Sequence, residues 1–399
     1  MFNRSVITIG LAYAAFIGLG LVSGLINLAW APMKEEFNIA LDATLSALLL
    51  ANTLGYLGAS FFSGTVAARI GAGRLLIVGA GAMALGLSGY VIAPQWEIVI
   101  LAGFITSVGN GLTDAGLNAY LAEHHGARAM NWLHACFGIG TTISPLIVTA
   151  ILGGDQSWRV AYGAVAVLEV LLVVAFALSI SWWKVSAVNH VEGNRISIGA
   201  TLRRPIVWMG ILLFLLYAGL EVTPAQWSSQ LFTEARGVDA AFAGILVSVY
   251  WGSFTIGRMI FGTLLKGFSY RVLIGCIVAA LIGALLFWWN PVAELGYLGL
   301  IILGFSQAPI FPLLISNTPR VVGAEYAPNA IGFQVAGAGI GVAIMPGLAG
   351  ALADSAGITI VPPYIVVVAV IFAGLFIFGL ARRAPVTPSK ADAFSSIGD

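Results

Sequence analysis

Two copies of one short motif decide how this 399-residue chain is organised. Residues 138–145 read GIGTTISP, and residues 339–346 read GIGVAIMP. The offset between the copies is 339 − 138 = 201 residues. The same offset recurs in two other pairs, Gly18-Leu19 with Gly219-Leu220 and Gly103-Phe104 with Gly304-Phe305. Several matches at one offset and in one order predict that the chain consists of two related halves.

The composition of both halves is that of a membrane protein. Hydrophobic residues make up 59% of the chain and charged residues 9%, and the mean hydropathy is +0.98. A soluble domain has about a quarter charged residues, so the composition excludes a soluble enzyme and a disordered protein. The net charge of +1 provides no basic field for nucleic acid. Cys136 and Cys276 lie in separate apolar segments and are predicted to be core residues.

Apolar runs long enough to cross a bilayer recur along the chain. A helix needs about 20 apolar residues to cross the hydrocarbon layer, and within one such run only a helix satisfies its own backbone. Twelve runs meet this requirement, near residues 6–32, 42–68, 75–93, 97–122, 129–153, 158–183, 205–232, 239–265, 272–290, 294–318, 328–353 and 359–381. The sequence therefore predicts an all-α membrane protein with twelve transmembrane helices.

The twelve spans divide into two pseudo-symmetric groups of six. Residues 1–183 form the N-terminal half and residues 205–383 the C-terminal half. The polar, basic segment 184–204 is expected to be a cytoplasmic linker, and residues 384–399 a cytoplasmic tail. Two parallel six-helix halves are a transporter architecture, in which the solute site lies at the midplane between the halves.

The lysines and arginines predict the orientation. With the amino terminus inside, fourteen of the eighteen basic residues fall on the cytoplasmic side, three fall outside, and Arg258 lies within a span. Since cytoplasmic loops carry the basic excess, we expect both termini in the cytoplasm and a multi-pass protein of a bacterial inner membrane. The first apolar run reaches Trp30 and is too long for a signal-peptide core, so it is expected to remain as a span.

The loop after the second span carries a family motif. Residues 64–74, GTVAARIGAGR, resemble the loop signature of the major facilitator superfamily, and Trp158-Arg159 at the start of the sixth span fits the same family. Ala68 stands where the family usually has an aspartate before the arginine, and the second copy of the loop has Lys266. The resemblance implies the twelve-helix fold of a secondary transporter, with Arg69 as a gate or latch residue.

A closer resemblance, over most of the chain, is to the fucose permease group of fucose–galactose–proton symporters and their relatives. It is carried by Asn110-Gly111 with Asp114 and Asn118, by Asn131-Trp132-Leu133-His134, by Tyr217, Gly219, Glu221 and Trp227, by Gly257-Arg258, and by Pro309-Ile310-Phe311-Pro312. The resemblance implies proton-coupled sugar transport. Fucose permease is expected to use an acid in its first span as well as one in its fourth, and the first span here contains none.

Ionisable residues within the spans are functional candidates, because a charge in hydrocarbon costs several kcal/mol unless it is paired or hydrated. The candidates are Asp114, Glu169, Glu221 and Arg258, with His134 as a further titratable group. His134 could contact the solute or relay a proton, or it could be a hydrogen-bonded core residue. Glu169 is in the sixth span, which usually flanks the bundle, so a structural role is the stronger expectation for it.

Asp114 has an asparagine one helical turn away on each side. Asn110 and Asn118 therefore share its face of the fourth span. Three carbonyl-bearing side chains in a row can bind a sugar hydroxyl, a proton or a sodium ion. The alternative is a structural polar seam against a neighbouring helix.

Glu221 in the seventh span is the second predicted proton-coupling residue. A carboxyl group moved out of water favours its neutral form, so Glu221 could take up and release a proton during transport. Arg258 in the eighth span cannot be neutralised and needs a partner. Asp114 is one candidate partner, which would make a latch between the halves; a local role within the second half is the other.

A sugar site needs amides and hydroxyls for the sugar hydroxyls and aromatic rings for its C–H faces. The predicted solute-binding residues are Asn27, Asn52, Asn110, Asn118, His134, Tyr217, Trp227, Tyr250, Gln307 and Gln334. Further aromatic candidates are Phe16, Trp30, Tyr56 and Trp251, all of which could instead be packing residues. The sequence contains no nucleotide loop, metal cluster or catalytic triad, so we expect no enzyme activity, no cofactor and no metal.

These observations favour a proton-coupled secondary transporter that moves a sugar or related small polar solute by alternating access, and we expect it to be a monomer in the lipid bilayer. Sodium could replace the proton, because Asp114 with two asparagines suits either ion. A second alternative is proton-driven efflux of amphipathic compounds, and a third is a sensor that transports nothing.

Overall fold

The computed structural model describes residues 4–39, 43–154, 156–183, 196–265 and 267–381. Within these residues the chain is helical without a strand, and twelve helical segments are long and apolar enough to cross a membrane. The predicted all-α fold with twelve membrane helices is therefore confirmed. Much of the predicted linker lies outside the described residues, as does the whole of the predicted tail.

The helices follow the predicted spans closely. The first half contains α1 (Arg4–Glu36), α2 (Ala43–Ile70), α3 (Ala72–Ile92), α4 (Trp96–His124), α5 (Ala127–Gly153) and α6 (Trp158–Leu178). The second half contains α8 (Pro205–Gln230), α9 (Ala240–Leu264), α10 (Tyr270–Trp289), α11 (Ala293–Gln307), α12 (Ile310–Val322), α13 (Ala327–Ala356) and α14 (Val361–Ala381). Shorter pieces are η1 (Ile180–Trp182), α7 (Ile198–Leu202), η3 (Leu231–Ala235) and η4 (Ile358–Ile360).

The tenth span departs from the prediction because it is broken. The sequence predicts one helix over 294–318, but α11 ends at Gln307 and α12 begins at Ile310. Pro309 lies between them. A proline has no N–H to donate and its ring clashes with the carbonyl four residues earlier; the helix is interrupted here, whereas α5 and α13 continue through Pro145 and Pro346. The break leaves helix ends inside the membrane region, which is typical of solute sites in transporters.

Glycines let helices within each half approach closely. A Cβ built on Gly20 of α1 would lie 2.8 Å from the main-chain nitrogen of Thr141 and 2.9 Å from the Cα of Gly140, both on α5. A Cβ on Gly341 of α13 would lie 2.9 Å from the main-chain carbonyl carbon of Leu215 on α8. These are the contacts of the GIG motifs, and small residues at such crossings allow tight packing in a membrane.

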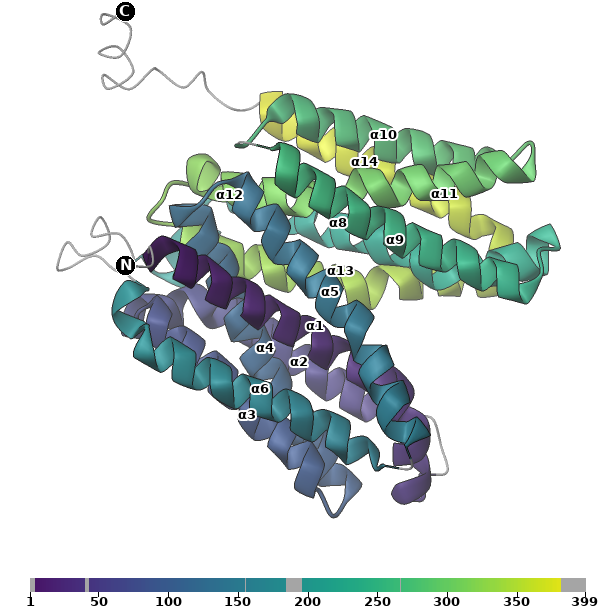
Figure 1. The fold of residues 1–399 in the computed structure, drawn as a ribbon. Helices are drawn as coiled ribbons and strands as arrows, with labels where there is room; N and C mark the ends of the chain where they lie inside the picture. Colours follow the sequence, from purple (N-terminus) through teal and green to yellow (C-terminus); the bar gives the residue numbers. More distant parts are fainter. Residues whose placement is uncertain (1–3, 40–42, 155, 184–195, 266, 382–399) are drawn as a thin grey trace, which may run out of the picture.

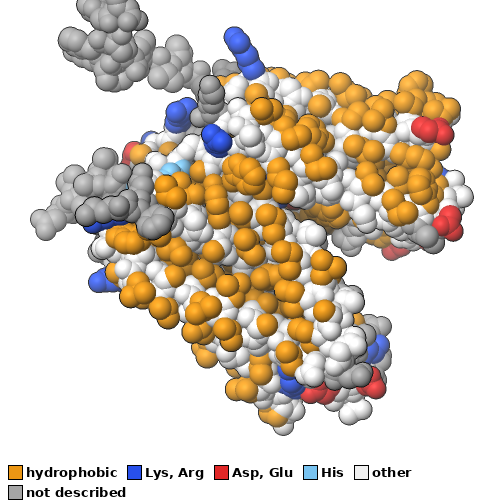
Figure 2. Space-filling model, viewed as in Figure 1, with side chains coloured by type: hydrophobic (Ala, Val, Ile, Leu, Met, Phe, Trp, Pro, Cys, Tyr) orange, Lys and Arg blue, Asp and Glu red, His pale blue; other side chains and the backbone are white. Residues whose placement is uncertain are grey.

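The two halves touch toward one end of the bundle. We call this end, where α1 begins and α14 ends, the basic end. There Phe61 of α2 stacks on Phe333 of α13 with ring centroids 4.4 Å apart, and Thr65 donates to Asn329 at 3.2 Å. On the other side of the interface, α5 packs against α9. Figure 1 shows the halves diverging away from this end, and Figure 2 shows an open notch between them at the opposite end.

The flanks of both halves are apolar. Exposed side chains such as Leu85, Leu171 and Trp289 lie on them, and Figure 2 shows hydrophobic atoms over the visible face of both halves with the charged groups toward the two ends. This distribution is that of a protein whose solvent is lipid between two aqueous layers.

Candidate functional site

Asp114 lies at the centre of a hydrogen-bonded network in the first half. The Tyr56 hydroxyl on α2 donates to its Oδ2 at 2.6 Å, and Asn118 Nδ2 donates to its Oδ1 at 2.7 Å. Tyr56 reaches Asp114 because α2 and α4 meet at Gly111, where a Cβ would lie 2.5 Å from the Tyr56 carbonyl oxygen. Both carboxylate oxygens therefore accept from neutral donors.

His134 extends this network to the interface between the halves. Its Nε2 lies 3.1 Å from Asn118 Oδ1, so Nε2 carries the hydrogen in this bond. Its ring is held edge-on between Phe16 of α1, at 5.4 Å, and Phe311 of α12, at 4.8 Å. Because Phe311 belongs to the second half, the His134 ring contacts both halves.

Arg258 joins the second half to the network. Its Nη1 donates to the His134 carbonyl oxygen at 3.2 Å, and its guanidinium lies 4.1 Å from the centre of the Phe254 ring. Its Nη2 lies 3.9 Å from Glu221 Oε1. Of the two roles expected for Arg258, the structure does not form the pairing with Asp114: the carboxylate beside Arg258 is Glu221 of its own half, and Asp114 connects to it through Asn118 and His134.

Gln307 lies at the break of the tenth span with its amide unused. The side chain is fully buried, and neither Nε2 nor Oε1 has a hydrogen-bond partner. Its main-chain oxygen accepts from the Tyr217 hydroxyl at 3.0 Å, and the Tyr250 hydroxyl donates to the Glu221 carbonyl oxygen at 2.6 Å. A buried amide without partners costs free energy, which makes Gln307 a candidate for binding a polar solute that reaches this position.

Other predicted solute-binding residues lie elsewhere. Trp227 Nε1 donates to the Pro346 carbonyl oxygen at 3.0 Å and fastens α8 to α13. With its amide oriented to satisfy its neighbours, Asn52 donates to the Gly103 carbonyl oxygen at 3.0 Å and fastens α2 to α4. Asn110 is partly exposed on α4. Asn27 lies on α1, and its side chain is outside the described part of the structure.

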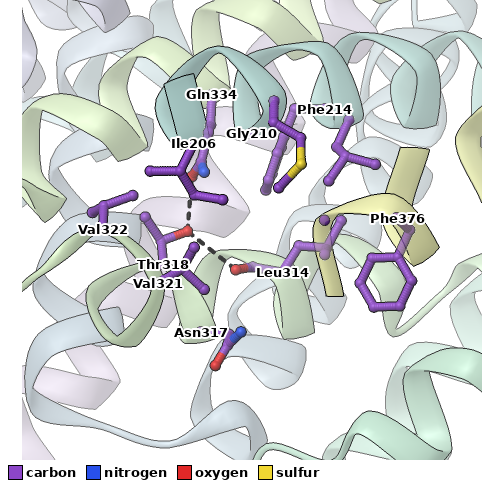
Figure 3. Close-up of a pocket in the computed structure, with 13 residues that line it drawn as sticks. Ile206, Gly210, Phe214, Leu314, Asn317, Thr318, Val321, Val322, Gln334 and Phe376 are labelled. Carbon is purple, nitrogen blue, oxygen red and sulfur yellow. Dashed lines mark hydrogen bonds between the residues drawn. The ribbon is translucent and has the colours of Figure 1, made fainter. Parts of the chain in front are cut away.

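Gln334 belongs to a separate cavity within the second half. Its Oε1 accepts from the Thr318 hydroxyl at 2.9 Å. Figure 3 shows both residues lining a mostly apolar pocket with Asn317, Leu314 and Phe376, between α8, α12, α13 and α14. The structure therefore separates Gln334 from the network at the interface of the halves.

Two further predicted residues stand apart. Arg69 is exposed on the last turn of α2, and the described residues give it no ion pair. Glu169 is buried on α6, and a Cβ on Gly18 of α1 would lie 2.5 Å from its Oε1. Its place between α1 and α6 fits the structural role that the sequence favours.

Two features of the site escaped sequence reasoning. Tyr56 was a candidate only for its aromatic face, whereas its hydroxyl binds Asp114. The break at Gln307 was missed, although Pro309 and Pro312 were a signal for it. No cluster of His, Cys, Asp or Glu within the described residues could hold a metal ion.

Comparison with known proteins places this geometry in context. The sequence model of the family described as Major Facilitator Superfamily matches residues 12–334 and 209–397. The glucose/mannose transporter GlcP of Bacillus subtilis (strain 168) is 22% identical over 351 residues, 85% of this chain and 86% of that protein. Sodium-dependent glucose transporter 1A of Mus musculus is 23% identical over 386 residues, 85% of this chain and 88% of that protein.

Among solved structures, the crystal structure of FucP in the outward conformation matches with a TM-score of 0.80 at 18% identity. The match covers 96% of this chain and 100% of FucP. At this identity the likeness concerns the fold, which is the same arrangement of helices.

Proposed function

The chain belongs to the major facilitator superfamily, and we propose that it carries a sugar or related small polar solute across the membrane by proton-coupled alternating access. Membership makes it a multi-pass membrane protein of a transporter family that handles small-molecule solutes, not an enzyme. The solute, the coupling ion and the cycle are the proposed part.

The observation that carries the proposal is the polar network across the interface of the halves. It runs from Asp114 through Asn118 and His134 to Arg258 and Glu221. An ionisable group within a membrane span is expensive to keep, and this network joins two carboxyl groups at the surface on which the halves must move. The unpartnered Gln307 amide supplies hydrogen bonds of the kind that a sugar hydroxyl uses.

The conformation fits one step of such a cycle. The halves meet toward the basic end and diverge at the other. Because basic residues favour the cytoplasmic side, the basic end is assigned to the cytoplasm, with both termini. On this assignment, we propose that the conformation is the step of the cycle closed to the cytoplasm and open to the outside.

The names of the similar proteins leave the coupling ion open. FucP is named a fucose:proton symporter, and the mouse protein is named a sodium-dependent glucose transporter. The surroundings of Asp114 favour the proton. A sodium ion needs several oxygen acceptors converging on it, whereas Tyr56 and Asn118 turn hydrogen-bond donors toward the carboxylate.

Uptake by the purified protein in liposomes tests the proposal. We expect one or more labelled sugars from a panel that includes glucose, mannose and fucose to accumulate under an inward pH gradient and not under a sodium gradient alone. Accumulation driven by sodium alone would overturn the proton assignment. Failure to move any sugar in the panel, with or without gradients, would overturn the solute assignment.

A further inference from the structure

The orientation of the Asn118 amide is fixed independently of the Asp114 carboxyl group. Asn118 Nδ2 donates to the main-chain oxygen of Asp114 at 3.0 Å as well as to Oδ1 at 2.7 Å. A main-chain carbonyl can only accept, so the NH2 group stays on this side whether or not Asp114 carries a proton. Oδ1 of Asp114 therefore always faces a donor.

A proton on Asp114 must for this reason sit on Oδ2. Oδ2 faces the Tyr56 hydroxyl at 2.6 Å. A tyrosine hydroxyl can donate or accept. While Asp114 is ionised, Tyr56 donates to Oδ2; when Oδ2 is protonated it becomes the donor, and the Tyr56 hydrogen has to turn to a different acceptor.

The ring of Tyr56 packs directly on the second half. A Cβ built on Gly339 of α13 would lie 3.0 Å from Tyr56 Cε1 and 3.2 Å from Cδ1. Gly339 has no side chain that could absorb a displacement of this ring. Any displacement of the Tyr56 ring that accompanies this change of donor therefore alters the contact between α2 and α13, which is a contact between the halves.

We infer that Tyr56 is the positioning residue that transmits protonation of Asp114 Oδ2 to the α2–α13 interface. The inference rests on the proposed proton coupling. The titratable neighbours that face Asp114 are Tyr56 from α2 and, through Asn118, His134 from α5; Arg258 and Glu221 of the second half lie beyond His134.

Infrared difference spectroscopy of the purified protein, titrated with pH and without any solute, tests the chemical step. The carboxyl band that Asp114→Asn removes reports the proton on Asp114. Tyr56→Phe keeps the ring but removes the donor to Oδ2, so the midpoint of this band should rise by about one pH unit or more. Tyr364→Phe, which removes a hydroxyl that donates to the Met345 carbonyl at 3.0 Å, should leave it unchanged.

An unchanged midpoint in Tyr56→Phe, or a carboxyl band that Asp114→Asn does not affect, overturns the inference. Because this measurement needs no substrate, it fails or succeeds separately from the sugar-uptake test of the proposed function.

The mechanical step is tested by the separation of the halves at the open end. Spin labels at Gln95→Cys and Glu294→Cys, both exposed there, would be placed in a background with Cys136 and Cys276 replaced by serine. We expect the distance distribution to depend on pH in the parent protein and in Tyr364→Phe, and to lose most of that dependence in Tyr56→Phe. Full pH dependence in Tyr56→Phe, or none in the parent, overturns the inference.

Discussion

The two halves hold their central carboxyl groups in different ways. Asp114 of the first half accepts from the neutral donors Tyr56 and Asn118, whereas Glu221 of the second half faces the guanidinium of Arg258 at 3.9 Å. A proton added to Asp114 leaves no neighbouring charge without a counter-charge, because both donors are neutral. A proton added to Glu221 leaves a buried cation without its counter-charge, which is costly.

Asp114 and Glu221, which were both predicted from the sequence to be proton-coupling residues, therefore differ in their surroundings. Asp114 is suited to gaining and losing a proton within a transport cycle. Glu221 is suited to holding Arg258 in place, where it donates to the His134 carbonyl oxygen across the interface. We therefore expect substitutions at the two carboxyl groups to affect different properties of the protein.

The largest effect is expected on stability when the ion pair is broken. Glu221→Gln should lower the free energy of unfolding by about 3 kcal/mol, because it leaves the buried Arg258 uncompensated. Asp114→Asn should cost about 1 kcal/mol or less, because an amide can still bond to both neutral neighbours. The measurement is denaturant-induced unfolding of the purified protein in one detergent.

A double variant is the control for this prediction. Glu221→Gln combined with Arg258→Gln removes both charges and should recover part of the lost stability. Equal losses of unfolding free energy in Glu221→Gln and in Asp114→Asn would show that the two halves do not differ in how they hold their carboxyl groups.

The next effect concerns the driving force. Asp114→Asn should reduce pH-gradient-driven accumulation of the solute about tenfold, a loss of about 1.4 kcal/mol of coupling free energy, while exchange of solute across the membrane continues. Uptake and exchange in the same liposomes measure the two quantities. If Asp114→Asn and Glu221→Gln both leave accumulation intact, neither residue couples the proton.

The smallest effect concerns the two glutamines of the second half. Gln307→Leu should weaken solute affinity about fivefold, close to 1 kcal/mol, without loss of stability, because its amide has no partner to lose. Gln334→Leu is the matched control: it removes the hydrogen bond from Thr318 at 2.9 Å and leaves that hydroxyl the Leu314 carbonyl oxygen at 3.1 Å, so it should lower stability slightly and leave affinity unchanged. Solute-binding calorimetry and thermal unfolding report the two outcomes, and the reverse pattern would move the solute site to the Gln334 cavity.

The sequence predicted the helices well because one physical requirement determines them. Each span must be apolar over the thickness of the bilayer, so residues 75–93 and 359–381 could be predicted as helices without knowledge of their neighbours. The repeat of GIG at one offset predicted two related halves, and the structure places both copies at close helix crossings.

Partners across helices could not be predicted in this way. Whether Arg258 meets Asp114 or Glu221 depends on the rotation and depth of three helices, which hydropathy leaves undetermined. The hydroxyl of Tyr56 was overlooked because a tyrosine in a span is usually a packing or interfacial residue. The ionisable residues could be identified from the sequence because a charge within a span is energetically costly. Which residues they contact could be determined only from the three-dimensional structure.

The crossing of α1 and α5 has a consequence for how the chain can vary. Opposite Gly20 lie main-chain atoms of α5, at 2.8 and 2.9 Å from a Cβ built there, and no rotamer change can move them. In a random library selected for growth on the transported solute, position 20 should accept glycine alone, whereas a lipid-facing position such as Leu171 should accept most apolar residues. The position least open to mutation would then be one whose side chain is a single hydrogen atom.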